Sequence, residues 1–535
     1  RRCIPPYIVL DFGNRGILGM QVPERWCGIG LSNRDAMRVV EQLAAIDLSL
    51  ATFTVVNNFL GIRPIQRYGA PTLRDELLPI LARGRELAAF ALTEPGSGSN
   101  PRSLAAIGNA YPTGGWKLQG TKIWSGSAAW AGVINVFVKL MDVDDQPLGV
   151  TGFVVRSGTP GLRHGKEALT MGMRGMVQNA VHLEGVPVQS GNLLGAVGSG
   201  MDAAQDAMTF TRLAIGAMSV GSMKRCLQLM HRYASRRSIS TGRLLDNPVT
   251  LARLSDLAAA TTAVETLIIQ ISELLDQGCL VPVDAYIACK TSGPEFLWKA
   301  VDSLVQLLGG RGYIESNIAP QILRDARVFR IFEGPTETLN MYLGSRVLHQ
   351  NTELHQFLCH TLNAANISDC LKEAAEQINA RWAEQPIAFS DRPAALRWAS
   401  LLIGEIATYA MLWAALQQTM NRTPSKRIDQ AIAWVRQQFD QTLTRALAAG
   451  PSQSILLSAN AATDLISSYA ETIGNLEQTL PGEDPDLDEF LRREPTTVHS
   501  ARTTNWSETV TPEAKFSVPN SGDANNTPPS IEATS

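Results

Sequence analysis

A glutamate lies in an unusual setting in the segment RIFEGPTETL. Glu333 follows two apolar residues, Ile331 and Phe332, and precedes the turn-forming pair Gly334 and Pro335. Apolar neighbours solvate a carboxylate poorly, which disfavours its charged form and raises its pKa. Such a placement is disfavoured unless something requires the carboxylate there. Taken alone, the segment also fits an ordinary turn that carries a glutamate.

A segment rich in Gly and Ser, FALTEPGSGSN at residues 90–100, is a second candidate. Its Pro and Gly residues predict a tight, irregular loop whose backbone N–H groups are free of ladder bonds. Such a loop can present donors to a polar ring system or a phosphate, and the same composition also fits a plain connector. Trp124, in GTKIWSGSAAW, can form a flat wall for a ring-shaped ligand or belong to a hydrophobic core.

Three further features carry charge or glycine. Arg212 lies in an otherwise apolar helix start, where it either forms a satisfied ion pair or anchors a substrate or a loop. The doublet Arg236-Arg237 can bind a pyrophosphate or face solvent. The run GGRG at residues 309–312 follows a helical segment rather than a strand. It therefore fails the context test for a dinucleotide-binding fingerprint and predicts a helix-ending turn.

The composition narrows the class of protein. The chain has 535 residues, of which 45% are hydrophobic and 18% charged, as in soluble globular proteins of several domains. Its formal net charge of -3 gives no basic excess, so nucleic acid is not expected as a partner. The seven cysteines include no CxxC pair. They predict reduced thiols in a cytoplasmic compartment, with neither a disulfide frame nor a metal site.

The most apolar stretch covers residues 401–416 and carries Glu405 in its middle. It is about four residues short of a bilayer span. We expect a buried helix here, with a helix lying on a membrane surface as the alternative.

The periodic segments predict a mostly helical chain with one β region. Asn33 is expected to cap the first clear amphipathic helix. Runs such as VINVFVKL and TGFVV, separated by turn signals at Gly114-Gly115 and Asp144-Asp145, predict a small antiparallel β domain. Strands and helices do not alternate, so a Rossmann domain is not expected. We expect an N-terminal helical domain with a truncated start, a β domain, a helical bundle, an extra helical domain and a disordered tail, at residues 1–89, 90–200, 201–350, 351–480 and 481–535.

Taken together, six segments resemble the acyl-CoA dehydrogenase family. TEPGSGSN, KIWSGS, TRLAIG, RRSISTGRLL, QLLGGRGY and IFEGPTE occur in the family's order, and the likeness runs from about residue 8 to residue 348. The resemblance implies an N-terminal helical domain, a central antiparallel β domain and a C-terminal four-helix bundle. The helical block after residue 350 resembles the C-terminal extension of the family's long-chain branch. FAD, a homo-oligomer (dimer or tetramer) and an electron acceptor such as an electron-transfer flavoprotein are implied as well.

The resemblance also carries the family's contacts onto numbered residues of this chain. Thr93 would bond the flavin ring, Trp124 would cover the flavin face away from the substrate, and Arg237 would reach the pyrophosphate of the flavin in the partner subunit. The implied cofactor contacts are Phe90, Leu92, Thr93, Gly98, Ser99, Trp124, Ser125, Gly126, Arg237, Gln306, Gly309, Gly310, Thr336 and Glu337. The implied substrate contacts are Ser99, Thr209, Arg212, Phe332 and Gly334.

Glu333 matches the family's general base. It would remove the α-proton of an acyl thioester while the β-carbon passes a hydride to flavin N5, and its backbone N–H would bond the thioester carbonyl. Some members carry their base on the earlier helix, just before the family's arginine. That position is Thr211 here, which has no carboxylate. The expected activity is therefore that of an oxidoreductase acting on CH–CH groups, as in fatty acid metabolism.

The chain departs from the family pattern at several cofactor and headgroup contacts. The differing positions are Asn100, Gly126, Thr209, Ser240, Val249 and Pro335. They motivate three alternatives to an acyl-CoA dehydrogenase. The substrate can be an acyl group tethered to a carrier protein, the electron acceptor can be oxygen, or the protein can be a flavin-poor relative kept for binding or assembly.

Overall fold

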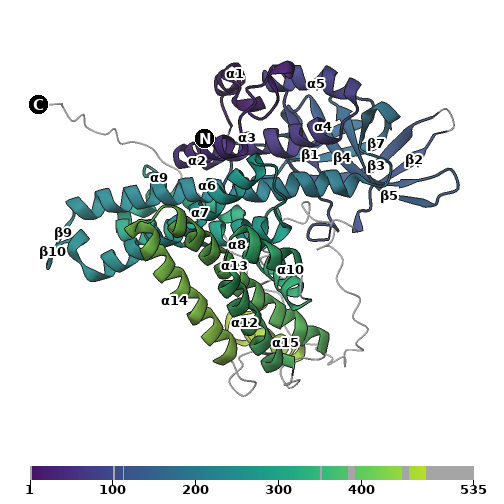
Figure 1. Cartoon of the computed structure of the whole chain (residues 1–535). Coiled ribbons are helices and arrows are strands. Elements are labelled where there is room, and N and C mark those ends of the chain that lie inside the picture. The colour runs from purple at the N-terminus through teal and green to yellow at the C-terminus, as the bar shows by residue number, and fades with distance from the viewer. Residues whose placement is uncertain are drawn as a thin grey trace, which may run out of the picture. The chain divides into compact units, whose positions relative to one another are not determined.

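The computed structural model describes residues 3–100, 103–111, 114–349, 352–383, 392–448 and 457–476. The chain divides into two units, Arg1–Phe490 and Leu491–Ser535. The predicted disordered tail at residues 481–535 lies outside the described residues. Figure 1 shows the described part of the first unit, with its helices and its one large sheet.

The N-terminal region is helical, as predicted. Its elements are α1 (Pro6–Asn14), α2 (Asn33–Ile46), α3 (Leu48–Val55), the π-helical segment η3 (Val56–Ile62), α4 (Arg63–Tyr68) and α5 (Pro71–Ala82). The predicted cap of α2 was wrong by one residue. The side chain of Ser32 caps the helix by accepting from the N–H of Asp35, whereas Asn33 donates its side-chain N–H to Asp276 Oδ1 over 2.8 Å.

The sheet contains β1 (Ala88–Ala91), β2 (Ile107–Ala110), β3 (Trp116–Gly126), β4 (Val133–Met141), β5 (Pro147–Arg156), β6 (Leu162–Glu167), β7 (Gln178–Val188) and β8 (Leu193–Leu194). The strands follow the order β6-β7-β3-β2-β4-β5-β8, with β1 also beside β4. The sheet is mixed rather than purely antiparallel, because β1 and β2 both run parallel to β4. Two consecutive strands can share this direction because the long loop between β1 and β2 brings the chain back to the same end of the sheet.

Long helices follow the sheet: α6 (Gly200–Arg236), α7 (Pro248–Asp276), α8 (Val283–Leu308), α9 (Ile318–Arg327) and α10 (Thr336–Leu348). Between α6 and α7 the chain forms the hairpin β9 (Ser238–Ile239) and β10 (Gly242–Arg243). Helices α6 and α8 approach closely at two glycines. A Cβ atom added to Gly293 would lie 3.2 Å from the Cα atom of Gly216. This close packing brings the polar side chains of the two helices to the same site.

The extension consists of α11 (Thr352–Gln356), the π-helical η10 (Phe357–Thr361), α12 (Ala365–Ala383), α13 (Arg392–Arg422), α14 (Lys426–Ala448), α15 (Ala459–Ser468) and α16 (Ala470–Ile473). Helix α13 packs backbone to backbone on α10, since a Cβ atom added to Gly344 would lie 1.8 Å from the carbonyl oxygen of Ser400. Side chains of α12–α14 share one hydrophobic core with α6–α10.

Two helices, α7 and α13, are long and apolar enough to cross a membrane. More than half of the most apolar stretch of each is buried inside the structure. Within residues 401–416, Ile403, Met411 and Leu416 are fully buried against the rest of the protein. The expectation of a buried helix in this stretch is therefore confirmed.

Candidate active site

Glu333 lies on a short turn between two helical segments. The 3-10 helix η9 (Val328–Arg330) continues α9, and α10 begins at Thr336. Glu333 adopts φ 56°, in the left-handed region, and Gly334 follows at φ 100°. A residue with a side chain costs about 1–2 kcal/mol in this conformation relative to the right-handed one. Backbone strain of this kind persists where the surrounding structure holds it in place, often at functional sites.

Two cations from different helices hold the backbone of this turn. Lys290 of α8 donates from Nζ to the carbonyl oxygen of Phe329 over 2.6 Å. Arg212 of α6 donates from Nε to the carbonyl oxygen of Glu333 over 3.2 Å. The sequence left open whether Arg212 joins an ion pair or anchors a loop, and the structure shows that it bonds the loop.

A carboxylate of α8 closes the turn from the other side. One oxygen of Glu295 accepts from Arg330 Nε over 2.7 Å and from Thr336 Oγ1 over 2.9 Å. These two donors flank Glu333 in the sequence, so a single carboxylate ties both ends of the turn together. Sequence reasoning missed both Glu295 and Lys290, because nothing local marks a helix residue as a partner of a turn some forty positions later.

The carboxylate of Glu333 is poorly solvated. The residue is half-buried, but its Oε2 atom has no contact with water and no hydrogen-bond partner in the described part of the chain. Burial raises the pKa of Glu333 to about 7, while the nearby charges of Arg212 and Lys290 oppose that rise. The carboxylate is thus partly protonated near neutral pH, and no hydrogen bond from the described residues restrains its Oε2 atom.

The apolar approach to Glu333 differs from the prediction in one respect. Phe332 is half-buried and packs its ring on Phe329, with the ring centroids 5.2 Å apart. Ile331, however, is 51% exposed. It follows the end of η9 at Arg330, where the chain turns and successive side chains point to different faces.

Helix α6 offers no second base at the predicted alternative position. Thr211 is buried, and its hydroxyl donates to the carbonyl oxygen of Ala207 over 2.8 Å. Thr209, a predicted substrate contact, is half-buried on the same helix. Glu333 is the carboxylate that the strained turn presents.

The predicted cofactor loop is bound to strand β3. Phe90, in β1, packs its ring on Phe137 at a centroid distance of 5.0 Å. Leu92 is buried, and its carbonyl oxygen accepts from Lys122 Nζ over 3.2 Å. The carbonyl oxygen of Thr93 accepts from the N–H of Ile123 over 2.9 Å. The loop therefore leaves the sheet in a position that the neighbouring strand sets.

A buried ion pair strengthens this attachment. Lys122 of β3 is fully buried and bonds Glu94 of the loop at 2.5 Å. Glu94 also accepts from the backbone N–H groups of Ala105 and Ala106, where the loop returns to the sheet. Burial lowers the pKa of Lys122, and the charge of Glu94 opposes that shift. Both residues stand inside the quoted motifs TEPGSGSN and KIWSGS, but their pairing was not predicted.

Trp124 faces outward from an irregular part of β3. The pairing of β3 with β7 shifts register between Lys122 and Ser125, and Trp124 adopts φ 53°. Its side chain is 62% exposed, so it does not belong to the core. Beside it, the hydroxyl oxygens of Ser125 and Ser127 are buried and lack hydrogen-bond partners among the described residues. An exposed indole next to two unsatisfied hydroxyls is an arrangement that fits a polar ring-shaped ligand.

The middle of the loop is open. Gly98 and Ser99 are exposed, and a Cβ atom added to Gly98 would meet no atom within 4 Å. At Gly126 the space is tighter, since an added Cβ would lie 3.3 Å from Met176 Cε and 3.4 Å from Gln178 Nε2. The space around the glycine-rich part of the loop is therefore open, whereas the space at the end of β3 is filled by neighbouring side chains.

The remaining predicted cofactor residues lie at exposed helix ends. Arg237 caps the C-terminus of α6, and Figure 1 shows the following hairpin at the end of α6 opposite the sheet. Gln306 lies in the last turn of α8, and Gly309, at φ 58°, ends this helix as predicted, with Gly310 exposed beside it. Glu337 is exposed in the first turn of α10.

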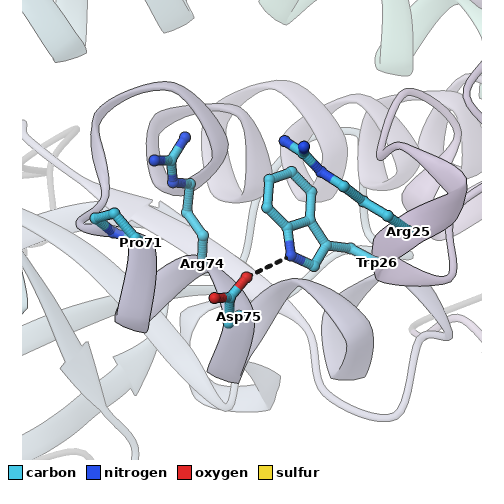
Figure 2. A pocket seen from close by; sticks show the side chains of 5 residues that line it. All are labelled: Arg25, Trp26, Pro71, Arg74 and Asp75. Atoms are coloured by element: carbon cyan, nitrogen blue, oxygen red, sulfur yellow. Dashed lines mark hydrogen bonds between the residues drawn. The ribbon is translucent and has the colours of Figure 1, made fainter.

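Two pockets of the described structure do not contain these residues. Figure 2 shows one of about 380 Å³ at the start of α5, where Trp26 donates from Nε1 to Asp75 and Arg25 stacks on its ring. A second, of about 890 Å³, lies along α2, α6 and α7. Within the described residues, no group of three or more His, Cys, Asp or Glu side chains could hold a metal ion.

Comparisons with known proteins match three consecutive regions of the chain. Family models of the acyl-CoA dehydrogenase N-terminal, middle and C-terminal domains match residues 1–85, 89–186 and 198–348. The mitochondrial very long-chain specific acyl-CoA dehydrogenase of Rattus norvegicus is 31% identical over 335 residues, covering 61% of this chain and 51% of the rat protein. An acyl-CoA dehydrogenase of Bacillus subtilis (strain 168) is 28% identical, covering 64% of this chain and 90% of that protein. The chain spans about half the length of the mammalian relatives it matches.

Solved structures share the fold. An acyl-CoA dehydrogenase from Bacillus anthracis, complexed with FAD, superposes with a TM-score of 0.72 at 22% identity and covers 87% of this chain and 85% of that one. The covered share of this chain is larger than the share that residues 1–348 represent, so the superposed region includes helices of the extension. The prolyl acyl carrier protein oxidase AnaB superposes with a TM-score of 0.62 at 21% identity, covering 65% of this chain and 91% of that one. Three consecutive domain matches on one shared fold show that the chain belongs to the acyl-CoA dehydrogenase family.

Proposed function

We propose that the protein catalyses the FAD-dependent α,β-dehydrogenation of an acyl thioester, with Glu333 as the general base. The observation that carries the proposal is the buried, unpartnered Oε2 atom of Glu333 on a strained turn. An oxygen without a hydrogen bond is free to take a proton, and the raised pKa of about 7 matches the proton affinity that a base needs near neutral pH.

The chain's own residues account for both ends of the proton transfer. The carboxylate of Glu333 takes a proton from the α-carbon, a carbon acid too weak to ionise in water. The N–H of Glu333 has no acceptor within the described residues and can donate to the thioester carbonyl oxygen, where negative charge develops. Arg212 holds the carbonyl of Glu333 and so sets the direction of the turn.

The residues of the β domain fit a flavin. Two buried hydroxyls without partners, Ser125 and Ser127, and the exposed indole of Trp124 would border its ring, and the open loop at Gly98 and Ser99 would accommodate its polar chain. FAD, when bound, accepts the hydride that leaves the β-carbon. The solved relative from Bacillus anthracis is complexed with FAD, which supports the same cofactor here.

We infer a homo-oligomer, and the positions of the distal residues support it. Arg237, Gln306, Gly309 and Gly310 are exposed at helix ends, and the hairpin after Arg237 lies at the opposite end of α6 from the sheet (Figure 1). If these residues contact FAD, that FAD belongs to a neighbouring subunit. An electron-transfer flavoprotein is the proposed acceptor of the electrons, and oxygen is the alternative.

A carrier-tethered acyl group is the second candidate for the substrate. It rests on the altered substrate contacts around Thr209, which stands where the family pattern has an aspartate. Both substrates present the same thioester to Glu333 and differ in the group that the surface must bind.

Anaerobic flavin bleaching tests the proposed function. The purified full chain is expected to carry FAD and to lose its yellow absorbance when mixed with a saturated acyl thioester. A panel of acyl-CoA esters of increasing length, matched to the same acyl groups on a carrier protein, identifies the substrate class. Robust turnover of free acyl-CoA excludes the carrier candidate, and peroxide formation in air identifies oxygen as the acceptor. A protein that fails to bind added FAD would contradict the proposal and favour a binding or assembly role.

The rate of flavin reduction is expected to rise with pH through about 7, because only the ionised form of Glu333 can take a proton and burial raises its pKa to about 7. Below that pH the carboxyl group is protonated in the folded protein and cannot act as a base, so the rate falls about tenfold per pH unit. Stopped-flow measurements at saturating thioester between about pH 5.5 and 8.5 check this. A profile that stays flat across the range would show that another group, or another step, limits the rate.

A further inference from the structure

Lys290 is a buried cation that the reaction described above does not use. It lies in α8, and its side chain has no exposed surface. Of its three N–H groups, one donates to the carbonyl oxygen of Phe329, and no second hydrogen bond is present among the described residues. A side chain that is always neutral would satisfy a single carbonyl without the cost of burying a charge. A side chain that can carry a positive charge therefore calls for a further reason.

The position of Phe329 supplies the first part of that reason. Phe329 is fully buried in η9, and its carbonyl stands four residues before Glu333. The hydrogen bond from Lys290 thus fixes the start of the strained turn, as Arg212 fixes its middle. The close packing of α6 on α8 brings both cations to the same turn.

The charges around Glu333 supply the second part. Four groups interact with Lys290: Glu333 most strongly among the carboxylates, then Arg212, Glu295 and Glu337. Glu295 is already engaged by Arg330 and Thr336, whereas Oε2 of Glu333 has no partner.

Burial and charge act in opposite directions on the two buried groups. Burial lowers the pKa of Lys290 to about 7 and raises that of Glu333 to about 7. The charge of Lys290 opposes the rise in the pKa of Glu333, and the charge of Glu333 opposes the fall in the pKa of Lys290. No hydrogen bond joins Lys290 Nζ to the Glu333 carboxylate in the described structure, so the coupling acts through space and through the turn.

We propose that Lys290 is a positioning residue for Glu333, which holds the turn that carries the base and favours the ionised form of its carboxylate in a site with little water. The inference rests on the proposed function only in naming Glu333 as the base. The interaction itself is a property of the folded chain and can be measured without turnover.

Infrared titration of the full chain tests the interaction directly. The C=O stretch of protonated Glu333 is identified as the band that Glu333→Gln lacks. Lys290→Gln keeps an N–H donor for Phe329 but removes the charge. We expect it to raise the titration midpoint of Glu333 by about one pH unit, since loss of a nearby opposite charge favours the neutral carboxyl. Lys299→Gln, an exposed lysine on the same helix, is the matched control and should leave the midpoint unchanged.

A second variant separates the charge from the hydrogen bond. Lys290→Met removes both, so we expect the same midpoint shift together with about a tenfold lower rate of flavin reduction at high pH, where Glu333 is ionised. Lys290→Gln should approach the wild-type rate there. An unchanged midpoint in the folded Lys290→Gln variant overturns the proposal, whatever its activity. If the midpoint shifts but no thioester bleaches the flavin of the wild-type chain, the Lys290 interaction stands and the proposed function is rejected.

Discussion

Replacing Glu333 with Gln is expected to lower the rate of flavin reduction by an acyl thioester about 10²- to 10⁴-fold. The amide has nearly the shape of the carboxylate but cannot take the α-proton. The backbone N–H that would bond the thioester and the carbonyl bonded by Arg212 both remain. Binding of FAD and of the thioester should therefore change little, so that the loss falls on the chemical step.

Anaerobic stopped-flow reduction at saturating thioester measures this loss, and the flavin absorbance of the purified variant confirms that the cofactor is retained. Glu315→Gln is the matched control, because Glu315 is a 75% exposed carboxylate that pairs with Arg324 at the surface. It should reduce flavin at the wild-type rate. If Glu333→Gln also kept that rate, another group would have to be the base.

Replacing Lys122 with Met is expected to destabilise the protein by about 3–5 kcal/mol and to weaken its hold on FAD. The substitution keeps an unbranched side chain that is only one atom shorter, but it leaves the carboxylate of Glu94, which is 4% exposed, buried without its cation. The N–H groups of Ala105 and Ala106 would then be its remaining partners. Because Glu94 ties both ends of the loop to the sheet, the predicted flavin contacts on that loop lose their fixed position.

Urea unfolding followed by circular dichroism gives the change in the free energy of unfolding, and ultrafiltration gives the fraction of FAD retained. Lys117→Met on the same strand is the control, since this exposed lysine stacks on Tyr111 and its replacement should cost no more than about 1 kcal/mol. The double variant Glu94→Gln, Lys122→Met removes both charges and should recover part of the lost stability. A single variant as stable as the wild type would show that Glu94 finds another way to relieve its charge.

The sequence by itself was enough to determine the order of the elements and to propose Glu333 as the base. The apolar positions of α7 recur at helical spacing, and Val264, Leu267 and Ile271 are buried as that spacing predicts. The turn signals at Gly114-Gly115 and Asp144-Asp145 fall between β2 and β3 and between β4 and β5. Such features are local, because periodicity and turn chemistry act over a few neighbouring residues. The Glu333 motif was likewise readable because its carboxylate, glycine and proline are adjacent.

Only the tertiary structure decided which distant groups meet. Neither the strained φ of Glu333 nor the exposed face of Ile331 could be inferred from the apolar run that precedes them. The hydrogen bond from Lys290 to Phe329 spans 39 positions, and the ion pair of Glu94 with Lys122 spans 28. A lysine within a helix or strand usually faces solvent, and no local pattern tells when packing will bury it. The partners of these charges depend on how α6, α8 and the sheet pack, which is why the groups that hold the Glu333 turn emerged only from the fold.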